Sequence, residues 1–390
     1  MKIKYRSDVL NIEKEIIKNR RDFHKHPELS FQEYRTSKIV AKLLKKYGLE
    51  VYEKVGKTGV VGLLKGAKKG KTIALRADMD ALPIQETSDL EYKSINDGVM
   101  HACGHDGHTA ILLGAAKVLS KMKNLINGNV KFIFQPAEEG LGGARFMIKD
   151  GALNNVDEIY GLHLWNYQSF GTIGIQSGPI MAAADKFKIT IKGKGGHGAT
   201  PQGTTDAIII ASQIIQIFQT IISRNSNPLD STVITIGQIN GGYNFNVIAD
   251  KVVLKGTTRA YTENNRLLIK NRMIEILNGL EKTFNAEIRL DYEDGYPPVI
   301  NHKDQTELLK NTAKKIIPKG VKKPYLSMGG EDFSYFIQEV PGCFFFLGSN
   351  PNKNKINTPH HCSHFNIDEK SLIVGASVFV QLIEDLLIKN

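Results

Sequence analysis

The spacing of hydrophobic positions in the first half of the chain alternates between that of helices and that of strands. Residues 10–22 and 34–47 repeat apolar side chains as amphipathic helices do, and Gly48 is placed to end the second. Helical spacing returns at 109–122. Short apolar runs typical of buried strands are VVGLL (60–64), TIALRA (72–77), VKFIFQ (130–135) and IYGLHL (159–164). This alternation predicts a largely parallel sheet covered by helices.

The second half begins with a different pattern. Polar and apolar residues alternate in KFKITIKGKG, as in a half-exposed strand, and long helical stretches follow at 206–222 and about 264–283. Further strands are predicted at STVITIGQI, KVVLKGTTRA and EIRLDYED. The order strand–helix–strand–strand–helix–strand predicts an α+β open sandwich inserted into the larger α/β domain. The earlier pattern then resumes, with a buried strand at 343–349 and a closing helix at 369–388.

Length and composition are those of a soluble protein with more than one domain. At about 150 residues per domain, 390 residues suggest two or three domains. The shares of hydrophobic residues (41%) and charged residues (23%) are ordinary for globular proteins. We find no run of about 18 apolar residues, so no membrane span is expected. The N-terminal stretch MKIKYRSDVLNIEKEI lacks the apolar core of a signal peptide, so we expect a cytoplasmic protein.

The net charge of +11 raises the hypothesis of a nucleic-acid partner. The lysines are scattered, however, with only local clusters such as KLLKKYG and KGAKKGK, and no nucleic-acid-binding motif is apparent. A solvated lysine-rich surface explains the charge better, and we expect no nucleic-acid partner. The three cysteines, Cys103, Cys343 and Cys362, are too few for a disulfide framework. Each is either a small buried residue or a reactive or metal-binding thiol.

Metal-binding side chains follow the predicted strands. They are Asp78 and Asp80 after 72–77, Glu138 and Glu139 after 130–135, His163 at the end of 159–164, and Cys103 and His105 in a glycine-containing loop before 109–122. Because sites form at the carboxyl ends of parallel strands, we expect these groups to converge. Thiolate, imidazole and carboxylate together favour zinc, with manganese, cobalt or nickel as alternatives. A bridging sulfur or carboxylate would allow two ions about 3.5–4 Å apart, and the adjacent glutamates can divide into ligand and general base.

Characteristic short motifs extend in order along essentially the whole chain. They are RRDFHKHPELSFQE (20–33), LRADMDALPIQE (75–86), MHACGHDGHTA (100–110), FQPAEEGLGGA (134–144), GLHLW (161–165), GKGGHGATP (193–201), GGYNFNVIAD (241–250), GTTRAY (256–261), GGEDFSYF (329–336) and HHCSHFNIDE (360–369). On these motifs the chain resembles the metal-dependent amidohydrolases that include aminoacylases, hippurate hydrolases, auxin-conjugate hydrolases and some carboxypeptidases. The resemblance implies a zinc-peptidase-like catalytic domain of residues 1–181 and 296–390. It also implies an inserted dimerisation or lid domain of residues 182–295.

The same resemblance implies a set of metal ligands for two divalent ions. These ligands are Cys103, His105, Glu139, His163 and His361. Cys103 would bridge the ions, with His105 and His163 on one of them. Glu139 and His361 would complete the other. The last ligand lies in TPHHCSHF (358–365), which departs from the Leu-His-x-Pro-like context usual in the family. Alignment on the following Phe-x-x-Asp-Glu selects His361, with His360 and His364 as competitors.

Further residues are implied to act on the substrate or on the ligands. Glu138 would be the general base, and Asp80 would hold the metal-ligand geometry. In the insert, His197 and Asn246 would hold the substrate or its oxyanion across a dimer interface. Two more residues have open alternatives. Arg259 would either pair with a substrate carboxylate or lie on the surface, and Gly330, in MGGED (328–332), would either approach the substrate backbone or belong to a loop that caps a helix.

The expected function is hydrolysis of the amide bond in N-acyl amino acids by a metal-activated water. Glu138 would deprotonate this water and later protonate the leaving amine, while the metals and His197 stabilise the oxyanion. A metallocarboxypeptidase and an N-acetyl-diaminopimelate deacetylase are rivals on the same site. A binding protein on an inactive scaffold is disfavoured, because the whole ligand set and Glu138 are present. The expected assembly is a homodimer or homotetramer, with no membrane partner.

Overall fold

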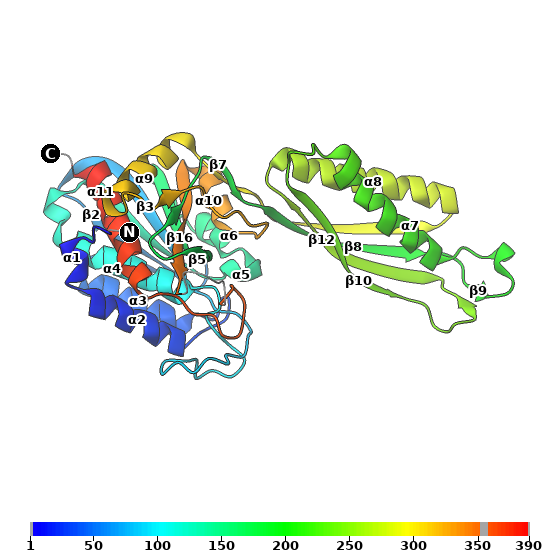
Figure 1. Ribbon diagram of the computed structural model, residues 1–390, viewed down its shortest axis with the longest axis horizontal. Coiled ribbons are helices and arrows are strands. Elements are labelled where there is room, and N and C mark those ends of the chain that lie inside the picture. Colours follow the sequence, from blue (N-terminus) through cyan, green and yellow to red (C-terminus); the bar gives the residue numbers. More distant parts are fainter. Residues whose placement is uncertain (1–2, 352–357, 389–390) are drawn as a thin grey trace. The chain divides into compact units, whose positions relative to one another are not determined.

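The structure is a computed structural model that describes residues 3–351 and 358–388 (Figure 1). It divides into two compact units, the second of which interrupts the first. Unit 1 comprises Met1–Ile180, Ile300–Leu326 and Asp332–Asn390, and unit 2 comprises Met181–Val299 and Ser327–Glu331. The predicted fold class, an α/β domain with an inserted α+β sandwich, is therefore confirmed.

Unit 1 is built on an eight-stranded mixed sheet whose central strands are parallel. In sheet order the strands are β1 (Glu50–Val55), β2 (Gly59–Lys65), β4 (Asn127–Gln135), β3 (Lys68–Asp78), β5 (Glu158–Ser169), β16 (Gly342–Asn350), β6 (Ile173–Gly174) and β15 (Val321–Lys322). The strands β1 and β2 form an antiparallel hairpin at one edge, and β2 also pairs antiparallel with β4. Four neighbouring strands, β4, β3, β5 and β16, thus end at one rim of the sheet.

Helices cover both faces of this sheet (Figure 1). They are α1 (Ser7–Leu10), α2 (Glu13–Lys25), α3 (Tyr34–Lys46), α4 (His105–Lys121), α5 (Glu138–Leu141), α6 (Gly143–Lys149), α9 (Lys303–Ile316), α10 (Phe333–Glu339) and α11 (Lys370–Leu387). Successive side chains along β16 point to opposite faces of the sheet. Phe345 and Leu347 join the core shared with α4 and α11, whereas Phe344 stacks near Phe333 of α10 on the other side. Burial on both faces explains why the central strands read as continuous apolar runs.

Unit 2 is a four-stranded antiparallel sheet with two helices packed on it. Its strands, in sheet order, are β10 (Thr232–Gly241), β12 (Lys251–Ala260), β8 (Ala183–Lys192) and β13 (Glu287–Tyr296), and its helices are α7 (Ala207–Thr220) and α8 (Glu263–Phe284). The helical stretch Ala207–Asn225 is long and apolar enough to cross a membrane. Its residues Ile210, Ile214 and Phe218 are fully buried in the core of unit 2, which accounts for part of that apolar character. Two short pairs complete the strands, β9 (Gly196–His197) with β11 (Val247–Ile248) and β7 (Gly178–Met181) with β14 (Val299–Asn301).

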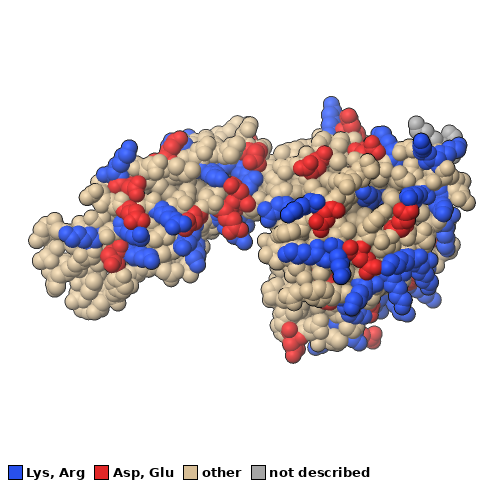
Figure 2. All heavy atoms as spheres, turned by 180° about the vertical axis from the view of Figure 1, so that it is seen from behind, with Lys and Arg blue, Asp and Glu red and all other residues tan. Residues whose placement is uncertain are grey.

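Basic and acidic side chains are interspersed on the face drawn in Figure 2, with a denser basic group on the larger unit. The two lysine clusters noted in the sequence are partly neutralised. Lys45 pairs with Glu53, and Lys65 pairs with Glu50. Lys71 lies 2.8 Å from the Glu158 carboxylate. These pairings favour a solvated surface as the explanation of the lysine clusters.

Candidate metal centre

The rim of the unit 1 sheet gathers the ligand types that the sequence analysis selected. One group combines Cys103, His105 and His163, and a second combines Cys103, Glu139 and His361. Within each group the ligand atoms lie within 4.8 Å of one another. The Cys103 thiol belongs to both groups, so its sulfur lies where a ligand shared by two ions would lie.

Two buried ligand atoms at this rim lack hydrogen-bond partners among the described residues. They are His105 Nε2 and Glu139 Oε1, which lie 4.0 Å apart. His361 Nε2 is 3.3 Å from the same Glu139 oxygen, and Cys103 Sγ is 3.5 Å from His163 Nε2. A buried polar group without a hydrogen bond costs about 1–3 kcal/mol, so two such atoms that face one another need an explanation. A cation bound between nitrogen, sulfur and carboxylate ligands supplies one, and the donor set fits zinc and its neighbours.

Hydrogen bonds at the far side of each imidazole present Nε2 as the ligand atom. His163 Nδ1 donates to the Leu164 carbonyl at 2.7 Å, and His105 Nδ1 lies 2.9 Å from the Asp80 carbonyl. Since a carbonyl only accepts, the ring proton of each histidine lies on Nδ1. Such partners fix the tautomer and the orientation of metal-binding histidines. His108 differs, because its Nδ1 donates to Asp78 at 2.6 Å and its Nε2 accepts from the Leu164 amide at 2.8 Å.

Nearby carboxylates make the electrostatic potential negative at His105 and Cys103. Burial lowers the pKa of His105, but Asp78 and Asp80 outweigh it and raise that pKa to about 10. Burial, followed by the charges of Glu139 and Glu138, holds the pKa of the Cys103 thiol well above its usual value. A field that favours a proton on His105 and opposes a thiolate also attracts a metal cation, which would offset both effects.

Glu138 and Glu139 leave the end of β4 through a tight turn. Ala137 has a left-handed backbone, with φ 54°, and the Glu139 amide donates to Asp80 Oδ2 at 3.0 Å. Glu138 is buried and forms a compact group with His105 and Glu139. The turn thus places two adjacent carboxylates on one side of the candidate ligands.

The competing histidines of the last ligand segment are separated by the structure. His361 joins the Glu139 group, whereas His360 Nε2 accepts from the Asn166 amide at 3.1 Å. The His360 ring also lies against Trp165, with centroids 4.8 Å apart. Among the described residues His364 belongs to none of the candidate metal groups. The geometry favours His361 as the ligand and His360 as part of an aromatic wall.

The predicted substrate residues His197, Asn246, Arg259 and Gly330 lie in unit 2, although Gly330 falls outside the predicted insert of residues 182–295. His197 is exposed on β9, and the amide of the next residue, Gly198, donates to the Asn246 carbonyl at 2.8 Å, so His197 and Asn246 lie close together. Arg259 is partly buried and donates to the Thr258 carbonyl at 2.9 Å. Gly330 packs beside Ala184, where an added Cβ would come within 2.8 Å of the Ala184 Cβ.

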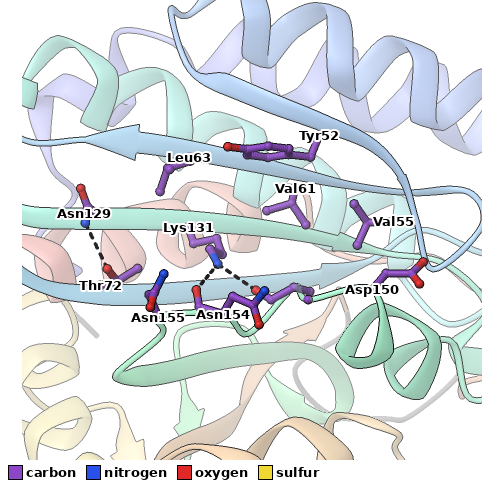
Figure 3. A pocket seen from close by; sticks show the side chains of 12 residues that line it. Tyr52, Val55, Val61, Leu63, Thr72, Asn129, Lys131, Asp150, Asn154 and Asn155 are labelled. Carbon is purple, nitrogen blue, oxygen red and sulfur yellow. Dashed lines mark hydrogen bonds between the residues drawn. The ribbon is translucent and has the colours of Figure 1, made fainter.

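A separate hollow on unit 1 does not contain the candidate ligands (Figure 3). It encloses about 390 Å³ and is lined mainly by β1, β2, β4 and the segment after α6. Lys131, at its centre, donates to the carbonyls of Ala152 at 3.1 Å and Asn154 at 2.7 Å. The ammonium group therefore holds the turn after α6.

Two sets of supporting residues at the rim were missed by sequence reasoning. Arg76 pairs with Asp78 at 2.7 Å and with Asp332 at 3.1 Å behind the ligands. Glu33 accepts the Ala137 amide, and Ser30 donates to Asp80. All of these residues lie in or beside the motifs that carried the family resemblance, which was the available signal.

Comparison with known proteins agrees with this chemistry. The family model described as peptidase family M20/M25/M40 matches residues 74–385. The chain is 46% identical to thermostable carboxypeptidase 2 of Saccharolobus solfataricus, covering 96% of this chain and 95% of that protein. It is 41% identical to N-acetyl-L-cysteine deacetylase of Bacillus subtilis, covering 97% and 90%. A solved dinuclear metal-binding peptidase of the M20 family from Bacillus subtilis matches with a TM-score of 0.84 and 35% identity, covering 96% and 98%.

Proposed function

The chain belongs to the peptidase family M20/M25/M40 and is a hydrolase of that family, and we propose that it cleaves the amide bond of N-acyl amino acids. The observation that carries this proposal is the pair of ligand groups that share Cys103, with Glu138 beside them. The similarity to an N-acetyl-L-cysteine deacetylase supports the substrate class. A metallocarboxypeptidase is the second candidate, because the identity to thermostable carboxypeptidase 2 is slightly higher.

Two divalent ions would be held at this centre, with zinc first and manganese, cobalt or nickel as alternatives. Cys103 would belong to both sites, His105 and His163 would complete one, and Glu139 and His361 would complete the other. The two unpaired buried atoms and the shared thiol support this assignment. When bound, the ions supply Lewis acidity that polarises the acyl carbonyl and lowers the pKa of the attacking water.

The three cysteines are free, which supports a reducing compartment such as the cytoplasm.

The chain's own residues supply the proton transfers and the positioning. Glu138 takes a proton from the attacking water and returns it to the leaving amine. Asp80 orients His105, whose Nδ1 lies 3.2 Å from Asp80 Oδ1. Arg259 and Gly330 contact the substrate in this scheme.

In the same proposal the insert of residues 182–295, which makes up most of unit 2, serves as a dimerisation or lid domain. Its exposed apolar side chains support a protein interface, and β10 is an open edge of the sheet. These side chains are Ile208, Ile209, Ile239, Tyr243, Phe245 and Val247. A twofold dimer would bury them against a second copy.

His197 and Asn246 act on the site of the partner subunit in this scheme. The Ala199 amide donates to His197 Nδ1 at 3.1 Å, so the ring proton lies on Nε2. An exposed Nε2–H is a suitable donor to a developing oxyanion.

A hydrolysis screen tests the proposed function. The purified protein is loaded with zinc, manganese, cobalt or nickel and offered N-acetyl amino acids, N-benzoyl amino acids and dipeptides. We expect turnover of N-acyl amino acids in at least one metal form, and Glu138→Gln is the matched inactive control. Turnover of dipeptides alone would favour the carboxypeptidase, and no turnover of any substrate would contradict both candidates.

A further inference from the structure

Glu33 is a fully buried carboxylate that binds the backbone of two distant turns. It lies directly before α3, at 0% exposure. Its Oε1 accepts the amide of Phe31 at 2.9 Å and the amide of Ala137 at 2.9 Å. Its Oε2 accepts the hydroxyl of Thr58. A single carboxylate oxygen therefore joins the segment before α3 to the turn that carries Glu138 and Glu139.

Both backbone positions held by this oxygen are left-handed. Ala137 has φ 54° and Phe31 has φ 61°, and neither is glycine. Residues with a Cβ rarely adopt this region, and they persist there only when the surrounding contacts determine them. At Ala137 such a contact is the hydrogen bond to Glu33. The next two residues are the proposed base and a proposed ligand, so the backbone at Ala137 sets the direction of both carboxylates.

The same segment reaches the turn a second time through Asp80. Ser30 Oγ donates to Asp80 Oδ2 at 2.7 Å, and the Glu139 amide donates to the same oxygen at 3.0 Å. Residues 30–33 thus support the turn at Ala137 directly and at Glu139 through Asp80. These contacts connect the stretch SFQE (30–33) to the turn that carries Glu138 and Glu139.

We propose that Glu33 is a positioning residue, which clamps the left-handed turn at Ala137 and so fixes the Glu138 and Glu139 carboxylates toward the metal centre. The inference rests on the proposed function for its effect on turnover, but the clamp itself is a property of the metal-free protein. What the clamp needs is an acceptor atom at Oε1. Glu33→Gln keeps a carbonyl oxygen that can accept both amides, and Thr58 can accept from the new NH₂ group. Glu33→Ala removes the acceptor.

The experiment compares Glu33→Ala and Glu33→Gln with two controls. Glu158→Ala removes another buried glutamate, at 6% exposure, which accepts from the Tyr160 hydroxyl and lies away from the turn. Thr58→Val removes the partner of Oε2 and leaves both amides on Oε1. For each variant we measure backbone hydrogen exchange of residues 134–141 in the metal-free protein, bound metal, and kcat and KM on the best substrate of the screen.

We expect Glu33→Ala to exchange faster at residues 134–141 than Glu158→Ala does, to hold metal more weakly, and to lose about 10- to 100-fold in kcat with a smaller change in KM. Glu33→Gln and Thr58→Val should stay within about threefold of the wild type in kcat. If Glu33→Ala does not fold, Glu33→Asp takes its place, because it keeps the charge and shortens the reach.

Two results would overturn the clamp. One is equal exchange at residues 134–141 in Glu33→Ala and Glu158→Ala. The other is a Glu33→Gln variant as impaired as Glu33→Ala, since the charge rather than the acceptor would then be required. If the wild type cleaves none of the substrates, the proposed function fails, while the exchange and metal measurements still decide the clamp.

Discussion

Replacing Glu33 by Gln should remove a pH dependence of stability that the buried carboxyl gives the wild-type protein. Burial, followed by the charge of Asp80, raises the pKa of Glu33 from 4.5 to about 7. Between these two pH values the folded state keeps a proton that the unfolded chain has lost. The free energy of unfolding therefore falls as pH rises through this window, and it is level below 4.5 and above 7. About 2.5 pH units at about 1.36 kcal/mol per unit amount to about 3 kcal/mol.

The assay uses the fluorescence of Trp165, the only tryptophan in the chain. Trp165 is 5% exposed on β5 and belongs to the same unit as Glu33, so its fluorescence reports the unfolding of unit 1. Urea titrations of the metal-free wild type and of Glu33→Gln, at pH values from about 5 to about 8, give the difference in free energy of unfolding. Titrations of all other groups are common to the two proteins and cancel. The wild type should lose about 2–3 kcal/mol relative to the variant by pH 7 and nothing more above it. A difference independent of pH would refute the reasoning.

Four further substitutions test the site. Cys103→Ala should lose metal and activity together, and normal binding of two ions per chain, measured by elemental analysis, would rule out a bridging thiolate. Glu138→Gln should keep its metal and lose about 10²–10⁴-fold in turnover, whereas Glu139→Gln should lose metal; equal metal loss in the two variants would reverse the assignment. His197→Ala should cost about 10²–10³-fold, and mixing it with Glu138→Gln chains should restore some activity, because one site of the mixed dimer has both groups intact. Activity that stays at the level of the separate variants, although subunit exchange is demonstrated, would exclude action across the dimer.

Most long periodic elements were predicted from the sequence, although the 14-residue helix α9 was missed, and the shortest elements were not predicted. The strands at 60–64, 72–77, 130–135 and 159–164 correspond to β2, β3, β4 and β5, each extended by a few residues. The first helix was expected at 10–22, but α2 covers Glu13–Lys25 after the separate turn of α1. The edge strand β1 was missed because most of its residues are exposed, and β6 and β15 are only two residues long. Periodicity needs several buried positions before it gives a signal.

Several side chains of the candidate metal centre were predictable because they lie at or after the ends of parallel strands, and the family resemblance supplied His361. Strand ends at one rim bring ligands together whatever the loop lengths are. Glu33 lacked this advantage, because it lies before a helix rather than at the end of a strand of the sheet. Its contact with Ala137 joins segments more than a hundred residues apart, and no spacing in the sequence encodes that pairing. Sequence reasoning therefore selected the candidate ligands and missed Glu33, which we propose positions two of the carboxylates.

Left-handed residues recur beside the candidate ligands, and only some of them are glycines that the sequence makes easy to recognise. Gly104, with φ 95°, separates Cys103 from His105, and a glycine adopts this conformation without a Cβ penalty. Ala137 and His361 adopt it as well, with φ 54° and 63°, and both carry a Cβ. Each is held by a hydrogen bond from its own backbone amide. The Ala137 amide donates to the Glu33 carboxylate, and the His361 amide donates to the Ala102 carbonyl at 2.8 Å. Where the ligand loop has a glycine, the turn is encoded locally. Where it has none, a contact from another segment must supply the restraint, and the ligand geometry then depends on the packing of the whole unit.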